Sequence, residues 1–443
     1  MKDESLYERV VRTGIPKINT ADTVVNAGAP YTGLMNSHHG QKFMQIQHLV
    51  ELALRHSPEV RDAESAWQAA QNDFEEAKGA LWPKVDFNAT SAAAKLGKGG
   101  NPYGNGTLNR LGATLSYTVF DGGRTSSLIA SKQHIAHSIE AKYLLARNKI
   151  AFDTSNAFLQ IARQQLLIIA YQGHLTQMKK LEKSMIEIVK VMPGRRSEFT
   201  QVSARVLQAE ENLNNAVSKK RDYQIELIKL VGEKIRIDDV KESEIELEPL
   251  SLEVALLRAE EHPAIQLADA EVSASKDQVE VSQATQAPQL DLVASKLNGV
   301  DQMGYADPGQ VYLSVKWNAF QGFSSKANER AALARAESSG EKLRQAVSDV
   351  EFKLNAAWAD YKTQTLRITN LLILKQGTDQ VRQDFFDQWQ SLGRRSLLEV
   401  LGAESEHLNT VVSLINSQVD QAIAASKMHF ESGEMAGWMV GVR

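Results

Sequence analysis

The residues of this chain best suited to ionic chemistry are two arginine pairs, each within the tetrapeptide Gly-Arg-Arg-Ser, at 194–197 and at 393–396. Arginine stays charged at physiological pH and binds a carboxylate through two parallel hydrogen bonds. The pairs could therefore bind acidic side chains of this chain or of a protein partner, although an exposed turn kept soluble by its charges is the simpler interpretation. Because the sequence contains no recognisable nucleophile elbow, phosphate-binding loop or paired-carboxylate arrangement, we predict that the protein is not an enzyme.

The sequence around the two tetrapeptides is also duplicated. Matched residues are 205 positions apart at first, then 200, then 199, as in Pro58/Pro263, Pro83/Pro288, Phe120/Phe320 and Gly194/Gly393. A period this long excludes short solenoid repeats and indicates two halves related by pseudosymmetry. We assign residues 41–245 to repeat 1 and 246–431 to repeat 2, between a polar N-terminal segment (1–40) and a C-terminal tail (432–443).

Composition excludes several classes of protein. A hydrophobic fraction of 43%, a charged fraction of 23% and a mean hydropathy of −0.32 fit neither a disordered chain nor a bundle of transmembrane helices. The net charge of −4 gives no basic field, so no nucleic acid is predicted as a partner. The chain has no cysteine, which excludes disulfides and thiolate metal sites. The adjacent His38 and His39 lack further ligands, so we predict neither a metal site nor a cofactor.

Apolar periodicity predicts the same elements in both halves. Repeat 1 is predicted to contain a helix over 44–81, a hairpin over 83–120, a long helix over 125–191 and a further helix over 198–231. Repeat 2 is predicted to contain their counterparts over 251–284, 288–320, 325–392 and 397–430. At about 1.5 Å per residue, each long helix would extend for roughly 100 Å, which an ordinary globular core cannot cover.

The predicted strands alternate between apolar and polar residues. In repeat 2, Val311, Leu313 and Val315 alternate with Tyr312 and Ser314. One face of such a strand suits lipid and the other water, although a soluble antiparallel sheet packed on helices would show the same alternation. Two hairpins supply only four strands, too few to close a barrel, and open sheet edges do not occur in lipid. Several chains would therefore have to contribute strands to a membrane barrel.

The order of elements, given twice, resembles the outer-membrane efflux (TolC) family over about residues 41–431. The most specific element is the segment 393–401, Gly-Arg-Arg-Ser-Leu-Leu-Glu-Val-Leu, which is similar to the family signature Gly-x-Arg-Ser/Thr-aliphatic-aliphatic-acidic-Val-Leu. The resemblance implies a mainly α fold with a small β part. It further implies a trimer that forms a twelve-stranded outer-membrane β-barrel continuous with a periplasmic α-helical barrel, in a Gram-negative bacterium.

The resemblance also implies roles for the two turns, which would lie at the periplasmic tip. Arg395 matches the gate arginine of the family, and Glu399 matches an inward-facing acidic residue. Gly402 and Gln390 depart from a family acid and from the gate tyrosine, which implies a looser closure. In the alternative interpretation, Arg395 caps helix carbonyls and Glu399 is a solvated helix residue. The gate and tip candidates are Gly194, Arg196, Thr200, Gln201, Gln390, Gly393, Arg395 and Glu399.

The implied partners are a periplasmic adaptor, an inner-membrane transporter and outer-membrane lipid. The residues expected to contact the adaptor are Arg195, Arg196, Ser197, Arg394, Arg395 and Ser396. The segment that follows, Ala-Glu-Ser-Glu at 403–406, is similar to members that serve ABC exporters, so type I secretion of a large adhesin or toxin is the favoured function. The alternatives are a multidrug or small-molecule duct with a proton-driven pump and, outside this class, a soluble elongated helical scaffold.

Overall fold

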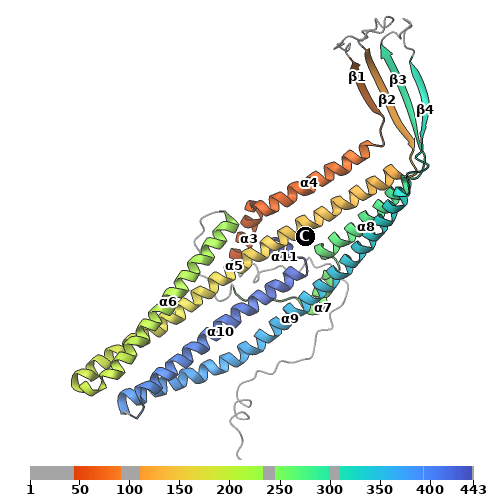
Figure 1. Ribbon diagram of the computed structural model, residues 1–443. Helices are drawn as coiled ribbons and strands as arrows, with labels where there is room; N and C mark the ends of the chain where they lie inside the picture. Colours follow the sequence, from red (N-terminus) through yellow and green to blue (C-terminus); the bar gives the residue numbers. More distant parts are fainter. Residues whose placement is uncertain (1–43, 91–109, 233–244, 299–308, 393, 442–443) are drawn as a thin grey trace, which may run out of the picture. The chain divides into compact units, whose positions relative to one another are not determined.

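The computed structural model describes residues 44–90, 110–232, 245–298, 309–392 and 394–441 (Figure 1). The first half comprises α3 (Met44–His56), α4 (Pro58–Gly79), β1 (Lys84–Thr90), β2 (Arg110–Phe120), α5 (Arg124–Val191), the short 3-10 helix η1 (Pro193–Arg195) and α6 (Arg196–Val231). The second comprises α7 (Leu252–Ala259), α8 (Pro263–Ala284), β3 (Gln289–Asn298), β4 (Gln310–Lys316), α9 (Ser324–Leu392), α10 (Leu397–Glu431) and α11 (Met435–Val440). This confirms the predicted fold class of the chain, mainly α with a small antiparallel sheet.

The first helix of each half is broken, whereas the sequence pattern predicted continuous helices over 44–81 and 251–284. Each helix restarts with a proline at its first position, Pro58 in α4 and Pro263 in α8. Proline has no N–H to donate and disfavours a helical conformation in the residue before it, but it suits a helix start. Ser57 and His262 precede these prolines and cap the new helices, because their side chains accept hydrogen bonds from the backbone N–H groups of Val60 and Ala264. The continuous prediction was therefore wrong at both sites.

The two long helices have 68 and 69 residues, so each extends for roughly 100 Å. At the start of α5, the Asp121 carboxylate accepts hydrogen bonds from the backbone N–H groups of Gly123 (3.1 Å) and Thr125 (2.8 Å). Gly123 has a left-handed φ of 88°. The matching position before α9 is Phe323, whose φ of 67° is unusual for a residue with a side chain. The backbone conformation of the second strand-to-helix turn is thus less favourable than that of the first, because a phenylalanine replaces the glycine.

The four strands form one antiparallel sheet in the order β1-β2-β3-β4. The central pair β2 and β3 joins the two halves, and the Thr118 hydroxyl donates to the Asp291 carboxylate across it at 2.8 Å. β1 and β4 form the two edges of the sheet. Apolar side chains on both edge strands are largely exposed, among them Val85, Phe87, Val311, Leu313 and Val315.

Side chains pack in separate apolar clusters along the helices. One cluster joins α3, α5, α6 and α11, where Met435 and Met439 of α11 are buried. Asn148 of α5 holds this C-terminal segment, since its side chain donates to the Gly433 carbonyl (2.6 Å) and accepts from the Ala436 N–H (2.9 Å). The region expected to be only a tail therefore contains a helix packed on the first half. Among the helices that the structure describes, none combines the length and the apolar character needed to span a membrane.

Candidate functional site

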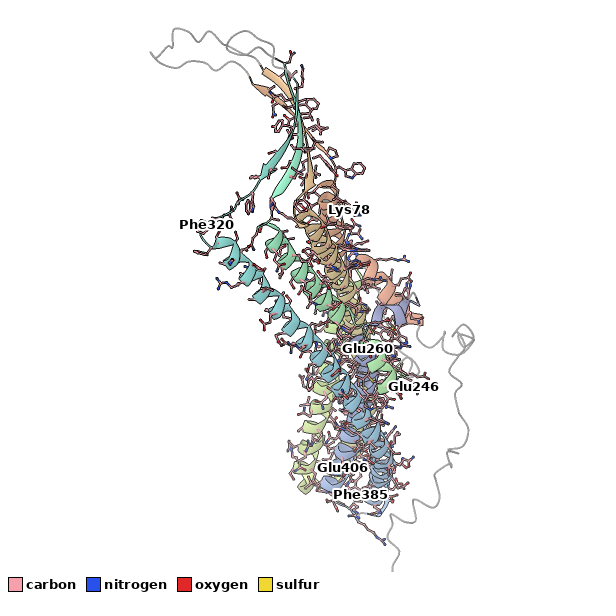
Figure 2. All side chains as sticks on the ribbon, turned by 90° about the vertical axis from the view of Figure 1, so that its right-hand side faces the viewer. Lys78, Glu246, Glu260, Phe320, Phe385 and Glu406 are labelled. Carbon is pink, nitrogen blue, oxygen red and sulfur yellow. The ribbon has the colours of Figure 1, made fainter. Side chains whose placement is uncertain are left out.

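The ends of four helices meet in one apolar cluster beside the two predicted turns. The buried members of this cluster come from both hairpins. They are Met178, Leu181 and Met185 of α5, Val202, Val206 and Ala209 of α6, Trp389 of α9, and Leu397, Val400 and Leu401 of α10. The Lys180 ammonium of α5 also lies 5.0 Å from the ring centre of Phe386 in α9. Figure 2 shows Phe385 and Glu406 at the end of the helices away from Phe320. The structure thus places the two hairpins, α5–α6 and α9–α10, against each other at their turns.

In the second turn, Arg395 is bound within its own hairpin. Its guanidinium donates to the Gln388 side chain (3.1 Å) and to the Glu399 carboxylate (2.7 Å). It also stacks over the Phe385 ring, with 4.2 Å between the guanidinium carbon and the ring centre. The Arg394 backbone N–H donates to the Gln388 carbonyl at 3.2 Å. In a single chain, therefore, Arg395 connects the end of α9 to the start of α10.

Glu399 and Ser396 form a reciprocal cap at the start of α10. The Ser396 backbone N–H donates to the Glu399 carboxylate (2.8 Å), and the Glu399 N–H donates to the Ser396 hydroxyl (3.3 Å). These hydrogen bonds, first that from the Ser396 backbone and then that from Arg395, lower the pKa of Glu399 to about 2. Glu399 is therefore ionised throughout the physiological pH range, as a cap and an ion-pair partner.

The first turn uses the same tetrapeptide differently. Arg195 donates two hydrogen bonds to the Glu198 carboxylate, at 2.9 and 2.6 Å, and this pairing raises the pKa of Arg195. The start of α6 has no side-chain cap. The Thr200 hydroxyl donates back to the Arg196 carbonyl at 3.1 Å. Gly194 lies in η1 without a left-handed φ, and a Cβ there would meet no atom within 4 Å, so this turn does not require glycine.

The predicted site residues fall into two groups. Arg195, Arg395, Ser396, Glu399 and Thr200 make the contacts described above. The remaining described candidates are exposed, namely Gly194, Arg196, Ser197, Gln201, Gln390 and Arg394, whereas Gly393 lies outside the described residues. Sequence reasoning missed Phe385, Gln388 and Glu198, all of which bind a turn arginine. Only Glu198 carried a signal, because its spacing of three residues from Arg195 on a helix favours a contact.

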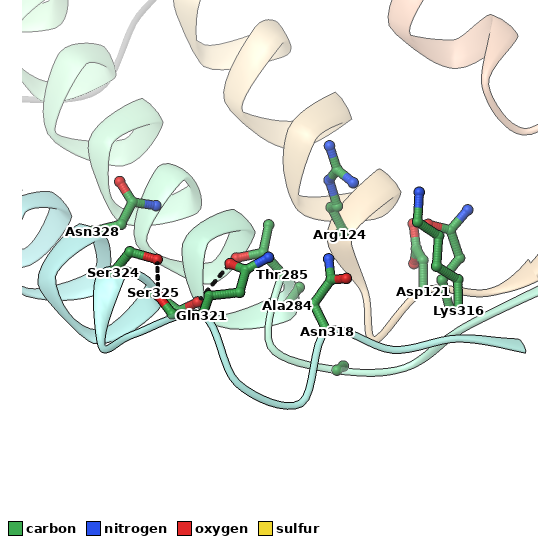
Figure 3. Close-up of a pocket in the computed structure, with 12 residues that line it drawn as sticks. Asp121, Arg124, Ala284, Thr285, Lys316, Asn318, Gln321, Ser324, Ser325 and Asn328 are labelled. Atoms are coloured by element: carbon green, nitrogen blue, oxygen red, sulfur yellow. Dashed lines mark hydrogen bonds between the residues drawn. The ribbon is translucent and has the colours of Figure 1, made fainter.

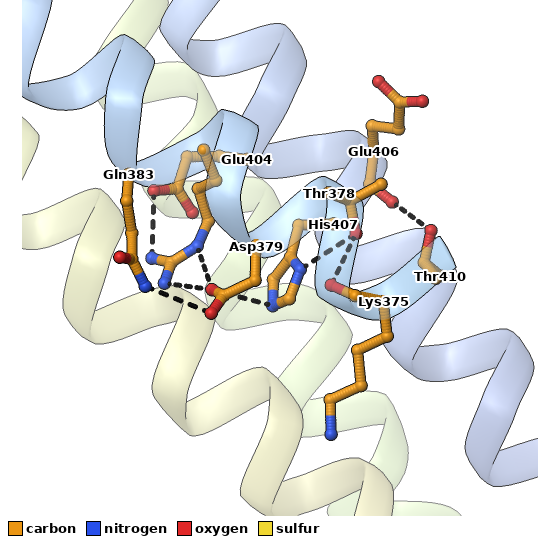
Figure 4. Close-up of polar contacts among 9 residues, drawn as sticks. Lys375, Thr378, Asp379, Gln383, Glu404, Glu406, His407 and Thr410 are labelled. Atoms are coloured by element: carbon orange, nitrogen blue, oxygen red, sulfur yellow. Dashed lines mark hydrogen bonds and ion pairs between the residues drawn. The ribbon is translucent and has the colours of Figure 1, made fainter. Parts of the chain in front are cut away.

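A second polar group lies behind the turns, between α9 and α10 (Figure 4). Arg382 donates to the Asp379 carboxylate at 2.6 Å and to that of Glu404 at 3.5 Å. His407 lies beside Asp379, with 3.8 Å between ring nitrogen and carboxylate oxygen, and its other nitrogen is 3.2 Å from the Thr378 hydroxyl. The sequence had given no role to Asp379, Arg382 or His407, and it had used Glu404 only as part of the segment 403–406.

A cavity of about 390 Å³ lies where the strands meet the helices (Figure 3). Its lining is polar and includes Asp121, Arg124, Lys316 and Gln321. Asp121 is engaged in capping α5, and Gln321 binds the hydroxyls of Ser324 (2.8 Å) and Ser325 (3.1 Å) at the start of α9. Asp121 and Gln321 therefore stabilise the two strand-to-helix turns. Among the described residues, no three histidine or acidic side chains converge as metal ligands.

Comparison with known proteins finds solved structures with a similar fold. The family model for outer membrane efflux proteins matches residues 49–233. No curated protein matches the sequence significantly. The structure is similar to VceC of Vibrio cholerae (TM-score 0.74, 20% identity, 88% of this chain and 96% of that chain covered) and to CmeC of Campylobacter jejuni (0.76, 17%, 94% and 94%). It is also similar to the open state of MtrE of Neisseria gonorrhoeae (0.75, 15%, 95% and 98%). At these identities the likeness to solved structures establishes the fold.

Proposed function

Since the chain belongs to the outer membrane efflux protein family and is one of its outer-membrane channels, we propose that three copies assemble into a closed duct. Three copies would contribute twelve strands to one barrel. The duct would carry cargo from an inner-membrane transporter, through a periplasmic adaptor, to the cell exterior. The proposal is supported by packing that a single chain leaves incomplete.

The two long helices are equivalent by sequence but are covered unequally. α5 packs against α4 and α6 of its own half and against α8 and α10 of the other half. α9 packs against α8 and α10, the counterparts of α4 and α6, but in the described part of the chain nothing comparable covers its second side. By the internal pseudosymmetry, α4 and α6 of a second copy fit that side.

One pair of phenylalanines carries this argument. Phe152 of α5 stacks on Phe430 of α10, with 4.8 Å between ring centres. Its counterpart 200 residues later, Phe352 of α9, is 72% exposed. Leu366 and Ile373 of α9 are 70% and 58% exposed. Large exposed apolar surface on one helix marks an interface, and the open edges at β1 and β4 need the same neighbour.

The oligomeric mass of the detergent-solubilised protein tests the closed duct. We expect native mass spectrometry to give three copies for the wild type and for Phe352→Leu, which keeps the face apolar. The double variant Phe352→Glu/Leu366→Glu places charges in the proposed interface and should yield monomers. A monomeric wild type, or an intact trimer of the charged variant, would contradict the proposed packing.

The exposed arginines, Arg196 and Arg394, are the better adaptor contacts, because Arg195 and Arg395 already bind carboxylates of their own hairpins. Arginine is favoured at protein interfaces, where it pairs with acidic side chains. Replacing Arg196 and Arg394 with alanine should weaken co-purification of the adaptor from native cells. Replacing Lys179 and Lys190, exposed cations of α5, is the matched control. If both double variants weakened co-purification of the adaptor equally, positive charge in general, and not the two turns, would explain the binding.

For the cargo, the segment 393–406 supports type I secretion of a large protein such as an adhesin or toxin, delivered by an ABC exporter. The family description, which names efflux, supports small-molecule export with a proton-driven pump as the second candidate. Cross-linking in native cells, followed by identification of the inner-membrane partner, separates them. An ABC exporter would support type I secretion, and a proton-driven pump would favour small-molecule export instead.

A further inference from the structure

The polar cavity between the strands and the starts of α5 and α9 contains two cations without a partner (Figure 3). The charged residues of its lining are Asp121, Arg124 and Lys316. Asp121 is occupied, because its carboxylate accepts hydrogen bonds from the Thr125 backbone N–H (2.8 Å) and hydroxyl (2.5 Å). In the described part of the chain, the side chains of Arg124 and Lys316 have neither an ion-pair partner nor a hydrogen-bond partner. The cavity therefore presents two cations that are free to bind an anion.

Two further carboxylates, on residues adjacent to the lining, also bind uncharged donors. Asp291 of β3 accepts hydrogen bonds from the Thr118 hydroxyl at 2.8 Å and from the Gln289 side-chain amide at 2.9 Å. Glu329 of α9 accepts from two glutamine amides at and just after the end of α8, at 3.0 and 3.1 Å. The acidic groups around the cavity thus bind hydroxyl and amide groups, and none of them pairs with the two cations.

The strand register determines which face of the sheet the cavity belongs to. Lys316 of β4 lies opposite Gln289 of β3, and both residues line the cavity. The residues before Lys316 alternate, so Val315 and Leu313 lie on the other face, where they are 69% and 62% exposed. In the proposed duct the apolar face contacts lipid and the polar face lines the water-filled interior. The cavity would therefore lie on the inner wall, where the strands meet the helices.

The chemistry of the lining fits an oxyanion. A guanidinium can bind two oxygens of a phosphate or carboxylate at once, and an ammonium adds a second positive charge. The side-chain amides of Asn318 and Asn328 also line the cavity, and neither has a hydrogen-bond partner among the described residues. They can supply uncharged donors beside the two cations. The volume of about 390 Å³ lies within the range of small-molecule sites.

We propose that this cavity is an oxyanion-binding site on the inner wall of the duct, in which Arg124 and Lys316 bind phosphate or carboxylate groups. The proposal rests on the duct function, which places the polar face of the sheet in the interior. Three copies would bring three such cavities to one level of the passage. Rings of arginine and lysine side chains favour anions over cations in pores. The site would therefore attract acidic groups of a passing cargo, or free phosphate, to the point where the helices give way to strands.

The exposure of the two cations determines how tightly the site binds. Both Arg124 and Lys316 are exposed, so water and salt weaken their attraction for an anion. We therefore expect a dissociation constant for inorganic phosphate on the order of 1 mM at low salt, which becomes larger as the KCl concentration rises. Weak binding suits a wall that cargo must leave again, because conduction requires that an ion or molecule can dissociate.

Isothermal titration of the detergent-solubilised protein with inorganic phosphate tests the site directly. The double variant Arg124→Gln/Lys316→Gln should bind phosphate at least about tenfold more weakly than the wild type, because it loses both charged donors. The matched control Lys84→Gln/Lys326→Gln removes two exposed cations of β1 and α9 that do not line the cavity, and it should bind as the wild type does. Equal binding by Arg124→Gln/Lys316→Gln and the wild type would overturn the site. If that variant fails to assemble, Lys316→Gln alone should weaken binding, and Lys316→Arg should retain it.

Bilayer recordings separate failure of the site from failure of the duct. Under a KCl gradient, Arg124→Gln/Lys316→Gln should shift the reversal potential toward that of potassium, and the lysine control should not. Hexaglutamate and inorganic phosphate, added separately, distinguish cargo carboxylates from free phosphate by which of them reduces the current of the wild type. Phosphate binding in solution without any conductance would contradict the duct and leave the site intact. Conductance with no binding of either probe and an unshifted reversal potential would overturn the site and leave the duct intact.

Discussion

The two helical turns share a tetrapeptide but are stabilised by different contacts. In the first, Arg195 binds Glu198 and the following helix has no side-chain cap. In the second turn, the second arginine of the tetrapeptide, Arg395, binds Gln388 before the turn and Glu399 after it. Ser396 caps the helix that follows. The difference lies in the residue four positions after the second arginine, Glu399 in one turn and Thr200 in the other. An identical motif therefore gives different local structure when its neighbours differ.

The largest expected effect concerns the apolar cluster that joins both turns. Trp389 is 6% exposed and comes from the second hairpin. Trp389→Ala should lower the free energy of unfolding by about 3–5 kcal/mol, because it leaves a cavity among four helices. Chemical denaturation of the assembled protein measures the change. Trp389→Phe, which retains most of the volume, is the control, and an equally large loss there would show that the indole itself is required.

Removing Arg395 should affect the tip more than removing its counterpart in the first turn. Arg395→Ala breaks the contacts to Gln388, Glu399 and Phe385 at once. We expect a loosened closed tip and a higher single-channel conductance. Arg196→Ala, at the equivalent exposed position of the first turn, should leave the conductance unchanged. Unchanged conductance in Arg395→Ala would show that Arg395 does not help to hold the gate closed.

The serines of the two tetrapeptides provide a closer comparison. Ser396→Ala removes the helix cap and should cost about 1 kcal/mol of stability. Ser197 lies exposed within the first turn of α6, so Ser197→Ala should change stability by less than about 0.5 kcal/mol. Thermal melts of the two variants, run in parallel, give the difference. Equal losses would mean that the caps do not distinguish the turns.

The smallest effect is the pH response of the second cap. The pKa of Glu399 is lowered to about 2 in the folded chain, so its contribution is present above the ordinary glutamate pKa of about 4.3 and is lost as the pH falls toward 2. After correction for its intrinsic pH dependence, hydrogen exchange of the amides at 396–400 should become faster in that window. Glu399→Gln should show faster exchange already at pH 6. Constant protection of the wild type down to pH 2 would contradict the capping geometry.

Much of the fold was predictable because periodicity reports helices and strands directly. The boundaries of α5 and α6 agree closely with the predicted ones, since long helices carry many turns of the pattern. The breaks at Pro58 and Pro263 were missed, although Ser-Pro and His-Pro are local stop signals. α11 could not be predicted, because a six-residue helix depends on the groove that buries Met435 and Met439.

The candidate site was less predictable than the fold. The contact between Arg395 and Glu399 follows from their spacing of four residues on one helix end. Gln388 and Phe385 lie on the preceding helix, and only the folded turn brings them to Arg395. Asp379 and Arg382 of α9 meet Glu404 and His407 of α10 only when these two helices pack, so the spacing of the four residues in the sequence carried no signal.

Ion conductance of the purified protein in a planar lipid bilayer tests the central claim most directly, that copies of this chain close into a membrane duct. The account predicts stable conductance from wild-type trimers and none from the Phe352→Glu/Leu366→Glu variant. Intact trimers that insert into lipid and never conduct, at any pH or voltage, would contradict it.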